Sequence, residues 1–457
     1  MRLILLSGGS GKRLWPMSND SRSKQFLKVL RDECGQPISM LQRVWQQLLA
    51  VGLQNDAYIC ASKAQVDIIE SQLGDVPLIV EPERRDTFPA IALSTLCLAD
   101  SEGLSDDEVV AALPIDPYVD ASFFESVAKL EADLRASNAD LALIGVRPTE
   151  PTSKLGYIRP LAAAANGQAF LSVASFVEKP AHDDAMRLIA DGALWNCGVF
   201  AFRIRYLRSV LTELGYPNTY EELLQQFSGL VKRSFDYEVV ERAKTIVVRP
   251  YEGTWKDLGT WSTLCEEIDD DFVGSGTAVA SDQTHVINEL GIPIVAMGLK
   301  GAVVVASPDG ILVANKEHSE RIKDVIGAFA GRPMYEERRW GMYRVLDYRK
   351  LDDGKEVLTR WVELHQGQHL TYQRHQKRSE LWTIVEGTAE FALDNRIVTV
   401  SAGDVLRVSQ NQWHAIRALT PLKFVEVQTG SEVSEEDTIR RFITWNEVVA
   451  YCSVVAI

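Results

Sequence analysis

The strongest constraint on the fold is the alternation of short apolar runs with longer amphipathic stretches from the start of the chain to about residue 265. The apolar runs end at Gly, Pro, Asp or Ser and are expected to be strands: Leu3–Leu6, Ala57–Ala61, Val109–Ile115, Leu141–Val146 and Phe170–Val177. Apolar residues at helical spacing predict helices between them, in Ile38–Leu49, Lys63–Leu73, Ala90–Ala99 and Phe123–Arg135. The alternation predicts an open, largely parallel sheet with helices on both faces, whose ligands bind beyond the carboxyl ends of the strands.

The texture of the chain changes after the acidic stretch Glu266–Asp271. Short β-like runs follow, then a polar and basic segment at 331–339 that is expected to be a connector. From about residue 340 to 445, many short period-two segments with Gly-bearing turns predict a β-sandwich or small barrel. We therefore predict three parts, with boundaries at 1–268, 269–334 and 335–457.

Composition excludes some classes of function. The chain of 457 residues carries a formal net charge of −15, so it has no basic surplus with which to coat a nucleic acid. The six scattered cysteines form no Cys-x-x-Cys pair, which favours a reducing compartment. The apolar run at the N-terminus is too short for a secretory signal or a membrane span. We expect a cytoplasmic protein without nucleic-acid or membrane partners.

A glycine-rich segment follows the first expected strand directly, Ser7-Gly8-Gly9-Ser10-Gly11-Lys12-Arg13-Leu14-Trp15-Pro16. Such a turn lets backbone N–H groups approach phosphates. The segment matches neither the Walker A template nor the dinucleotide fingerprint, so by itself it is either a tight turn or another kind of phosphate loop. Two cations, Arg13 and Lys24, bracket it and favour binding of a triphosphate.

The loop together with Lys24-Gln25-Phe26 resembles the signature of sugar-1-phosphate nucleotidylyltransferases, specifically the mannose-1-phosphate guanylyltransferases. Further segments resemble this family in the expected order: Glu81-Pro82 through Asp86-Thr87-Phe88-Pro89-Ala90, Leu113-Pro114-Ile115-Asp116, Phe176-Val177-Glu178-Lys179-Pro180, Trp195-Asn196-Cys197-Gly198 and Trp255-Lys256-Asp257. The resemblance implies a Rossmann-like, GT-A-like fold with a mixed sheet. It also implies an enzyme that converts GTP and mannose 1-phosphate to GDP-mannose and pyrophosphate. Relatives with this architecture commonly dimerise, so a homodimer is expected.

The resemblance also implies roles for individual residues. Asp116 and Asp257 would hold Mg²⁺, and Arg13 and Lys24 would neutralise the phosphates. The nucleotide would contact Gly8, Gly9, Ser10, Gly11, Lys12, Asp86 and Pro89. The sugar phosphate would contact Lys179 through its phosphate, and Gly156, Tyr157, Glu178 and Asn196 through its sugar.

Three positions depart from the family pattern. Lys12 stands where Thr is frequent, Asp86 where Asn is common, and Pro117 where the family has a histidine after the central aspartate. A carboxylate at position 86 accepts hydrogen bonds but cannot donate them as an amide does, which leaves the choice of base open. Another hexose 1-phosphate, CTP or UTP, or a non-catalytic sensor of nucleotide sugars, remain alternatives. The sequence does not choose among polysaccharide, glycolipid and GDP-fucose pathways.

The C-terminal region resembles a cupin, which in two-domain relatives carries mannose-6-phosphate isomerase activity. Its first motif runs from Gln373 to Gly387 and its second from Gly403 to His414. Lys377 stands where a second histidine would complete a His-x-His pair, and Leu381 where relatives often have histidine. Gln373, His375, Glu380 and His414 are still a chemically acceptable set of ligands for Zn²⁺ or another divalent metal. The alternative is a degenerate cupin that packs, dimerises or regulates.

Overall fold

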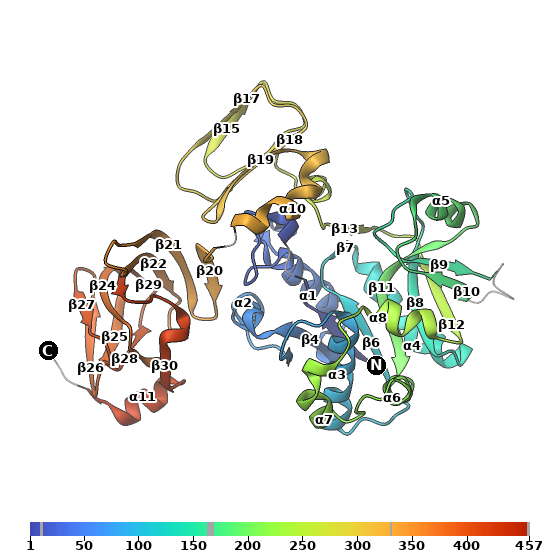
Figure 1. Ribbon diagram of the computed structural model, residues 1–457, viewed down its shortest axis with the longest axis horizontal. Coiled ribbons are helices and arrows are strands. Elements are labelled where there is room, and N and C mark those ends of the chain that lie inside the picture. Colours follow the sequence, from blue (N-terminus) through green and yellow to red (C-terminus); the bar gives the residue numbers. More distant parts are fainter. Residues whose placement is uncertain (10–11, 162–168, 330, 455–457) are drawn as a thin grey trace.

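The computed structural model describes residues 1–9, 12–161, 169–329 and 331–454. Figure 1 shows an α/β domain in blue and green, a small β-rich part in yellow, and an all-β domain in orange and red. The predicted succession of fold classes is therefore confirmed. Within the described residues, none of the helices has both the length and the apolar character needed to cross a membrane.

The α/β domain is built on a sheet of nine strands. In spatial order they are β5 (Leu78–Glu81), β4 (Ala57–Ser62), β1 (Arg2–Leu6), β6 (Val109–Pro114), β11 (Leu194–Arg203), β8 (Leu141–Val146), β12 (Ile246–Tyr251), β10 (Leu171–Val177) and β9 (Tyr157–Pro160). The expectation of a largely parallel sheet is wrong, because β11 runs antiparallel to both of its neighbours β6 and β8, and β10 runs antiparallel to β12 and β9. An apolar pattern records which faces are buried, but not the direction in which a strand enters the sheet.

Helices cover both faces of this sheet, as predicted. One core packs α1 (Met40–Ala50), α2 (Val66–Leu73) and α4 (Ala121–Ser137) against the strands. The other core contains α3 (Thr87–Glu102), α6 (Ile204–Glu213), α7 (Tyr220–Gln225) and α8 (Phe235–Glu238). Local capping fixes where these helices begin: the Ser39 hydroxyl accepts from the Gln42 amide to start α1, and Asp120 accepts from the Ser122 amide to start α4.

A short two-stranded ribbon lies next to the carboxyl end of the central strand. The strand β7 (Pro117–Val119) follows β6 almost immediately and pairs antiparallel with β13 (Trp255–Asp257), so that Asp257 stands opposite Pro117. Asp116 lies between β6 and β7. This pairing places two aspartates that are far apart in the sequence at one point of the sheet edge.

The β-rich part contains two small sheets. Its strands are β14 (Phe272–Val273), β15 (Gly276–Val279), β16 (His285–Asn288), β17 (Ile294–Met297), β18 (Ala302–Ser307) and β19 (Gly310–Asn315). The strands β14, β16 and β18 are parallel neighbours, β19 is antiparallel to β18, and β15 pairs in parallel with β17. The other short elements around it are β2 (Leu30–Arg31), β3 (Pro37–Ile38), α9 (Trp261–Cys265) and α10 (Ile322–Ile326), and α5 (His182–Ala190) lies beside β9.

The β-rich part contacts the segment that joins the glycine loop to Lys24 and holds it in place. The Ser307 hydroxyl donates to the Pro16 carbonyl at 2.7 Å, and the Asn19 amide donates to Asp309 at 2.8 Å. Arg22 makes a bidentate pair with Glu289 at 3.0 and 2.8 Å. Gly310 has no room for a side chain, since a Cβ there would lie 2.5 Å from the Trp15 ring. Four contacts therefore fix the course of this loop.

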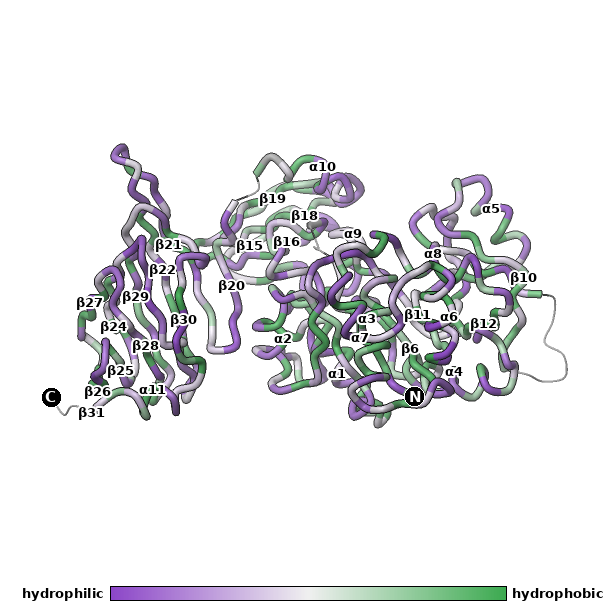
Figure 2. Tube along the Cα trace, turned by 60° about the horizontal axis from the view of Figure 1, so that its bottom comes forward, coloured by the Kyte–Doolittle hydropathy of each residue, from purple (hydrophilic) through white to green (hydrophobic). Residues whose placement is uncertain are grey.

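The C-terminal domain packs two six-stranded sheets around one core. One sheet is β20 (Tyr335–Arg338), β21 (Gly341–Lys350), β22 (Glu356–Leu364), β29 (Leu422–Gly430), β24 (Arg378–Glu386) and β27 (Val405–Val408). The other is β30 (Thr438–Phe442), β23 (Tyr372–His375), β28 (His414–Ala418), β25 (Thr388–Leu393), β26 (Arg396–Ser401) and β31 (Ser453–Val454), and α11 (Trp445–Tyr451) precedes β31 in chain order. Polar and apolar residues alternate along many of these strands (Figure 2).

The expected connector at 331–339 is only partly a connector. Its residues Tyr335–Arg338 form β20, which pairs with β21 at the edge of the first cupin sheet. The polar composition of this stretch suits an edge strand, because one side of β20 faces the α/β domain rather than the cupin core.

Candidate active site

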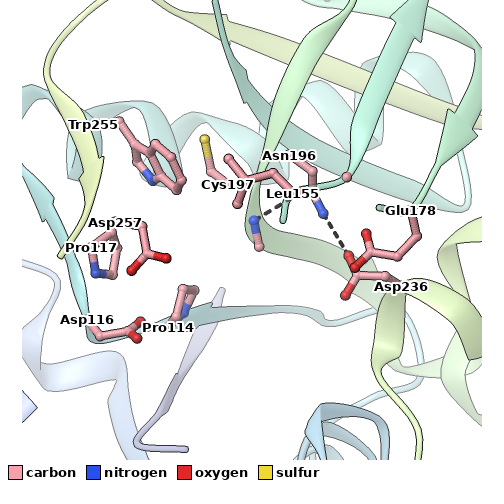
Figure 3. A pocket seen from close by; sticks show the side chains of 12 residues that line it. Pro114, Asp116, Pro117, Leu155, Glu178, Asn196, Cys197, Asp236, Trp255 and Asp257 are labelled. Atoms are coloured by element: carbon pink, nitrogen blue, oxygen red, sulfur yellow. Dashed lines mark hydrogen bonds between the residues drawn. The ribbon is translucent and has the colours of Figure 1, made fainter. Parts of the chain in front are cut away.

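Two adjoining cavities open at the carboxyl edge of the nine-stranded sheet. The smaller, of about 190 Å³, is lined by Leu155, Gly156, Glu178, Asn196, Cys197, Gly198, Asp236, Trp255, Asp257, Pro117, Pro114 and Asp116 (Figure 3). The larger, of about 520 Å³, is lined by Leu6 to Gly9, Cys60, Glu81, Arg84, Asp86, Thr87, Ala90, Lys232, Pro114 and Asp116. Pro114 and Asp116 belong to both. Two ligands bound in these cavities would therefore meet at Asp116.

Lys24 lies between the two predicted metal-binding aspartates. Its ammonium nitrogen is 2.7 Å from Asp116 Oδ2 and 3.0 Å from Asp257 Oδ1. Burial by itself lowers the pKa of Lys24, but the two carboxylates outweigh it and raise the pKa above its usual value, so Lys24 stays charged. Figure 3 shows the side chains of Asp116 and Asp257 on the same side of the pocket. The structure thus brings together three of the predicted residues.

The two carboxylates fit a small divalent cation. Each carboxylate directs an oxygen to within hydrogen-bonding distance of the Lys24 ammonium nitrogen. Both oxygens therefore face a single point, which suits a positive charge. Both side chains are also partly exposed, 27% for Asp116 and 46% for Asp257, which leaves room for phosphate oxygens and water in the same shell. Carboxylates combined with phosphates and water are the usual surroundings of Mg²⁺.

The opposite side of the smaller cavity holds a cluster of polar groups. The Asn196 amide donates to Asp236 Oδ1 at 2.7 Å, and its Oδ1 accepts from the Gly198 amide at 3.1 Å. Burial raises the pKa of Asp236 to about 7, and the negative charge of Glu178 adds to the shift. Gly156 allows Glu178 to approach, since a Cβ at Gly156 would lie 2.5 Å from the Glu178 carboxylate. These groups offer several donors and acceptors to the hydroxyls of a sugar.

Lys179 lies at the rim of this cavity rather than in its lining. Its ammonium pairs with Glu178 Oε1 at 2.8 Å, and its side chain is 49% exposed. Burial lowers the pKa of Lys179, but Glu178 more than compensates and raises it overall. The predicted lysine therefore stands beside the sugar-side carboxylate, half-exposed and paired with it.

Two buried glutamines hold the start of the glycine loop. The side-chain amides of Gln25 and Gln65 both donate to the Ser7 carbonyl, at 3.0 and 2.9 Å. Beyond this point Gly8 and Gly9 line the larger cavity, and Gly9 has a φ of 95°, which favours glycine. The predicted residues Ser10 and Gly11 lie outside the described residues, and Lys12 begins the 3-10 turn η1 (Lys12–Leu14).

The remaining predicted residues take varied places. Asp86 lines the larger cavity and caps α3, its Oδ1 accepting from the Thr87 amide at 2.8 Å. Pro89 is buried within α3 and Tyr157 is buried in β9, where its hydroxyl accepts from the Thr152 amide. Arg13 is on η1, close to the glycine loop. Pro89, Tyr157 and Arg13 are absent from the lining of both cavities.

Two carboxylates in these cavities have no place in the sequence-derived set. Glu81, only 7% exposed, lines the larger cavity, and within the described part of the chain its carboxylate has neither a hydrogen bond nor an ion pair. Burial raises the pKa of Glu81 to about 7, and the positive charge of Arg84 offsets only part of the effect. Asp236 lines the smaller cavity. Glu81 is visible in the sequence as the last residue of a strand, whereas Asp236 lies in a short helix that no pattern marks.

A second polar cluster is buried in the cupin domain. His375 Nε2 lies 3.2 Å from Glu380 Oε1, and His414 Nε2 lies 3.4 Å from Glu380 Oε2. Atoms of these three residues that can ligate a metal all lie within 4.8 Å of one another. Glu380 Oε2 and His414 Nε2 are buried and make no hydrogen bond in the described structure. Two orphaned ligand atoms facing one point fit a divalent metal ion.

The surroundings of this cluster set its charge states. Burial lowers the pKa of His375 to about 4, which keeps the imidazole neutral and able to ligate a metal. Burial by itself raises the pKa of Glu380, but His414, His375 and Arg378 outweigh it and lower the pKa overall. The backbone of Gln373 pairs with that of His414, while its side-chain oxygen accepts from Thr371 at 2.9 Å.

The two departures noted in the cupin motif fall outside the cluster. The Lys377 side chain is 49% exposed and its ammonium pairs with Glu432, and Leu381 is 41% exposed. Lys377 therefore takes no part in the buried cluster. Position 377 lies between β23 (Tyr372–His375) and β24, and the next residue, Arg378, is the one whose side chain reaches the cluster.

Comparisons with known proteins agree with this geometry. The model of the family "Nucleotidyl transferase" matches residues 2–272, and that of "Mannose-6-phosphate isomerase C-terminal" matches residues 333–443. The chain belongs to the nucleotidyl transferase family. The resemblance inferred from the sequence motifs is thus confirmed, as is the presence of an isomerase-like C-terminal domain.

The similarity of this nucleotidyl transferase to its relatives extends over almost the whole chain. It is 30% identical to mannose-1-phosphate guanylyltransferase RfbM of Salmonella typhimurium, over 96% of each chain. It is also 30% identical to the alginate biosynthesis protein AlgA of Pseudomonas putida, over 96% of this chain and 95% of that one. A crystal structure from Thermus thermophilus, described as a mannose-1-phosphate geranyltransferase, matches with a TM-score of 0.61 and 28% identity, covering 72% of this chain and 98% of that one.

The raised pKa of Asp236 predicts a pH dependence of stability in this nucleotidyl transferase. The folded chain holds the proton up to about pH 7, whereas an unfolded aspartate loses it near pH 4. Because the folded state binds more protons in this window, the free energy of unfolding falls as the pH rises through it. Asp236→Asn keeps an oxygen for Asn196 and removes the titration. Relative to wild type, we expect the variant to gain on the order of 2–3 kcal/mol between pH 5 and pH 8 in urea unfolding.

The matched control is Asp75→Asn, which changes an exposed aspartate of the same domain. It should leave the slope of stability against pH as in wild type. If stability depended on pH in the same way in wild type and in Asp236→Asn, the raised pKa of Asp236 would be contradicted.

Proposed function

We propose that this nucleotidyl transferase forms GDP-mannose and pyrophosphate from GTP and mannose 1-phosphate. A phosphate oxygen of the sugar phosphate attacks the α-phosphorus of GTP, a new P–O bond forms there, and the bond to the β-phosphate oxygen breaks. The observation that carries the proposal is the position of Asp116, at the junction of two cavities and beside both Lys24 and Asp257.

Electrostatics is the main task in this reaction, because nucleophile and electrophile are both anions. Asp116 and Asp257 would hold Mg²⁺, which supplies positive charge at the α-phosphate when bound. Lys24 would add a positive charge beside the ion. The N–H groups of Gly8 and Gly9, which line the larger cavity, would contact the departing phosphates together with Arg13. No group needs to become a covalent nucleophile, since positioning and charge neutralisation account for catalysis of this kind.

The sugar phosphate is assigned to the smaller cavity. Lys179 would pair with its phosphate, while Glu178, Asn196 and the backbone around Gly156 and Tyr157 would bind its hydroxyls. The free cysteines and the small soluble substrates suit a cytoplasmic enzyme. A homodimer remains a prediction.

The assignment of GTP rests on Glu81. A carboxylate with no partner of its own best accepts two neighbouring N–H groups. Guanine presents this pair, N1–H beside the exocyclic amine, whereas adenine and cytosine place a ring acceptor next to their amine and uracil has a single N–H between two carbonyls. Glu81 lies at the end of β5 in the larger cavity, beside the turn that starts α3. It therefore favours guanine over the other bases.

A coupled pyrophosphate-release assay tests the function directly. With GTP, ATP, CTP and UTP each combined with mannose 1-phosphate and glucose 1-phosphate, we expect GTP with mannose 1-phosphate to give the highest kcat/KM. Asp257→Asn removes a negative charge from the cation site and should lower kcat by about 100-fold or more. The control Asp269→Asn, which alters an exposed aspartate nearby in the chain, should behave as wild type. Absence of pyrophosphate release with every pair would overturn the proposal in favour of a sensor.

The role of Glu81 is tested by comparing GTP with ITP, which lacks the exocyclic amine. In wild type, the loss of one hydrogen bond to a buried carboxylate should lower kcat/KM for ITP by about 10- to 100-fold. Glu81→Gln should weaken the use of GTP and bring the GTP-to-ITP ratio to within about threefold. Glu83→Gln, a change at a more exposed neighbour that pairs with Arg85, is the control. An unchanged ratio in Glu81→Gln would remove Glu81 from base recognition.

The buried cluster in the cupin supports a second activity, the metal-dependent interconversion of mannose 6-phosphate and fructose 6-phosphate. The observation that favours it is the pair of unsatisfied atoms, Glu380 Oε2 and His414 Nε2, beside a neutral His375. His375, Glu380 and His414, with Gln373 as a further oxygen ligand, would hold Zn²⁺ or a similar ion.

Metal analysis of the purified full chain tests this second activity. We expect close to one bound Zn²⁺, Mn²⁺ or Co²⁺ per chain and turnover of mannose 6-phosphate. His414→Gln should lose the metal, whereas His365→Gln, which changes an exposed histidine, should keep it. A chain that binds no divalent metal and does not turn over mannose 6-phosphate contradicts the isomerase and leaves a domain that packs or regulates.

A further inference from the structure

We propose that the cavity between the α/β domain and the cupin binds the phosphate of a sugar phosphate, and that Lys63 of the α/β domain supplies one of its ligands together with Arg440 of the cupin. The identity of the sugar rests on the proposed isomerase activity, whereas the phosphate site rests on the charges and position of the cavity. The cupin site would then be complete only in the two-domain chain.

The cavity is built by both domains. Its volume is about 810 Å³. Lys63, Ala64 and Asp67 come from the 3-10 turn η4 (Lys63–Gln65) and from α2 of the α/β domain, and the other lining residues come from the cupin and its first strands. Figure 1 shows β20 close to α2 at this boundary. A ligand in the cavity would therefore touch residues far apart in the sequence.

Direct contacts between β20 and α2 hold the two walls in place. Arg338 pairs with Asp67 at 2.8 Å. Glu337 accepts from the Ser71 hydroxyl at 2.8 Å and pairs with Lys28 at 3.0 Å. The same helix follows Gln65, which is anchored in the α/β core by its bond to the Ser7 carbonyl. The position of Lys63 relative to the cupin is thus fixed by the contacts of Gln65 and α2, which follow Lys63 in the chain.

Some of the cations that line the cavity are paired with an acidic residue and others are not. Arg360 is paired with Glu426 at 2.6 Å, Arg378 with Glu380 at 3.0 Å, and Arg338 with Asp67. In contrast, neither Lys63 nor Arg440 has an acidic partner within the described residues, and both are exposed. The lining as a whole has a surplus of cations, because Lys63, Arg338, Arg339, Arg360, Arg378 and Arg440 outnumber the carboxylates of Asp67, Glu426, Glu435 and Glu436. In a chain with a net charge of −15, such a surplus at one cavity suits an anionic ligand.

The floor of the cavity leads toward the buried metal-type cluster. Arg440 stands opposite Gln373 in the pairing of β30 with β23, so the two side chains share a face of the sheet. Arg378 also lines the cavity, and its guanidinium lies 3.2 Å from His375 Nε2. A ligand with its phosphate at Lys63 and Arg440 would extend its other end toward His375 and Glu380. This polarity suits a sugar whose phosphate is remote from the reacting carbons.

Calorimetric titration of the full chain with mannose 6-phosphate, and with mannose as the ligand that lacks the phosphate, tests the site. Lys63→Glu should raise the Kd for mannose 6-phosphate at least about tenfold and leave the Kd for mannose unchanged, while Lys63→Arg should stay within about threefold of wild type. The control Lys129→Glu makes the same change of charge at an exposed lysine on α4, and should bind as wild type. Thermal unfolding midpoints equal to that of wild type show that the variants fold.

Binding is measured without turnover, so the outcomes separate the two proposals. Tight binding of mannose 6-phosphate that depends on Lys63, in a chain that does not isomerise it, supports this site and contradicts the isomerase. Isomerisation with an unchanged KM in Lys63→Glu supports the isomerase and overturns this site. A wild-type chain that binds mannose 6-phosphate no more tightly than mannose also overturns it.

Discussion

The active-site region depends on the pairing of β7 with β13, which places Asp257 beside Asp116. Two carboxylates so close together repel each other unless a cation lies between them, and the ammonium of Lys24 fills this role here. The ribbon, the lysine and the two acids thus form one electrostatic unit. Because Lys24 must be held at that point, the loop that carries it is fixed in turn by the β-rich part through Pro16, Asn19 and Arg22.

The β-rich part therefore has a structural task that its position in the chain does not suggest. It follows the nucleotidyl transferase domain in sequence, yet it packs against the loop near the N-terminus. The contact of Gly310 with the Trp15 ring is close enough that only glycine fits. In this arrangement the loop that would contact the phosphates is supported by a separate part of the protein.

In the cupin domain, the residues that depart from the family motif lie apart from the buried cluster. Lys377 and Leu381 differ from the pattern of relatives, but both side chains face outward, and the buried His375, Glu380 and His414 are intact. Arg378 is the cation that reaches the cluster, through Glu380 and His375. The same domain closes a cavity with α2, so the two halves of the chain share a boundary that is charged as well as packed.

The sequence by itself determined the local elements, since apolar periodicity is a property of neighbouring residues: β1, β4, β6 and β8 and the helices α1 to α4 fall close to the predicted segments. Its motifs also predicted, through family resemblance, that Asp116, Asp257 and Lys24 belong to one site. The direction of β11, the convergence of Asp116 with Asp257, the isolation of Glu81 and the outward turn of Lys377 were decided by the tertiary structure. These features depend on contacts between residues far apart in the chain, and a periodic pattern carries no information about which distant segments will meet.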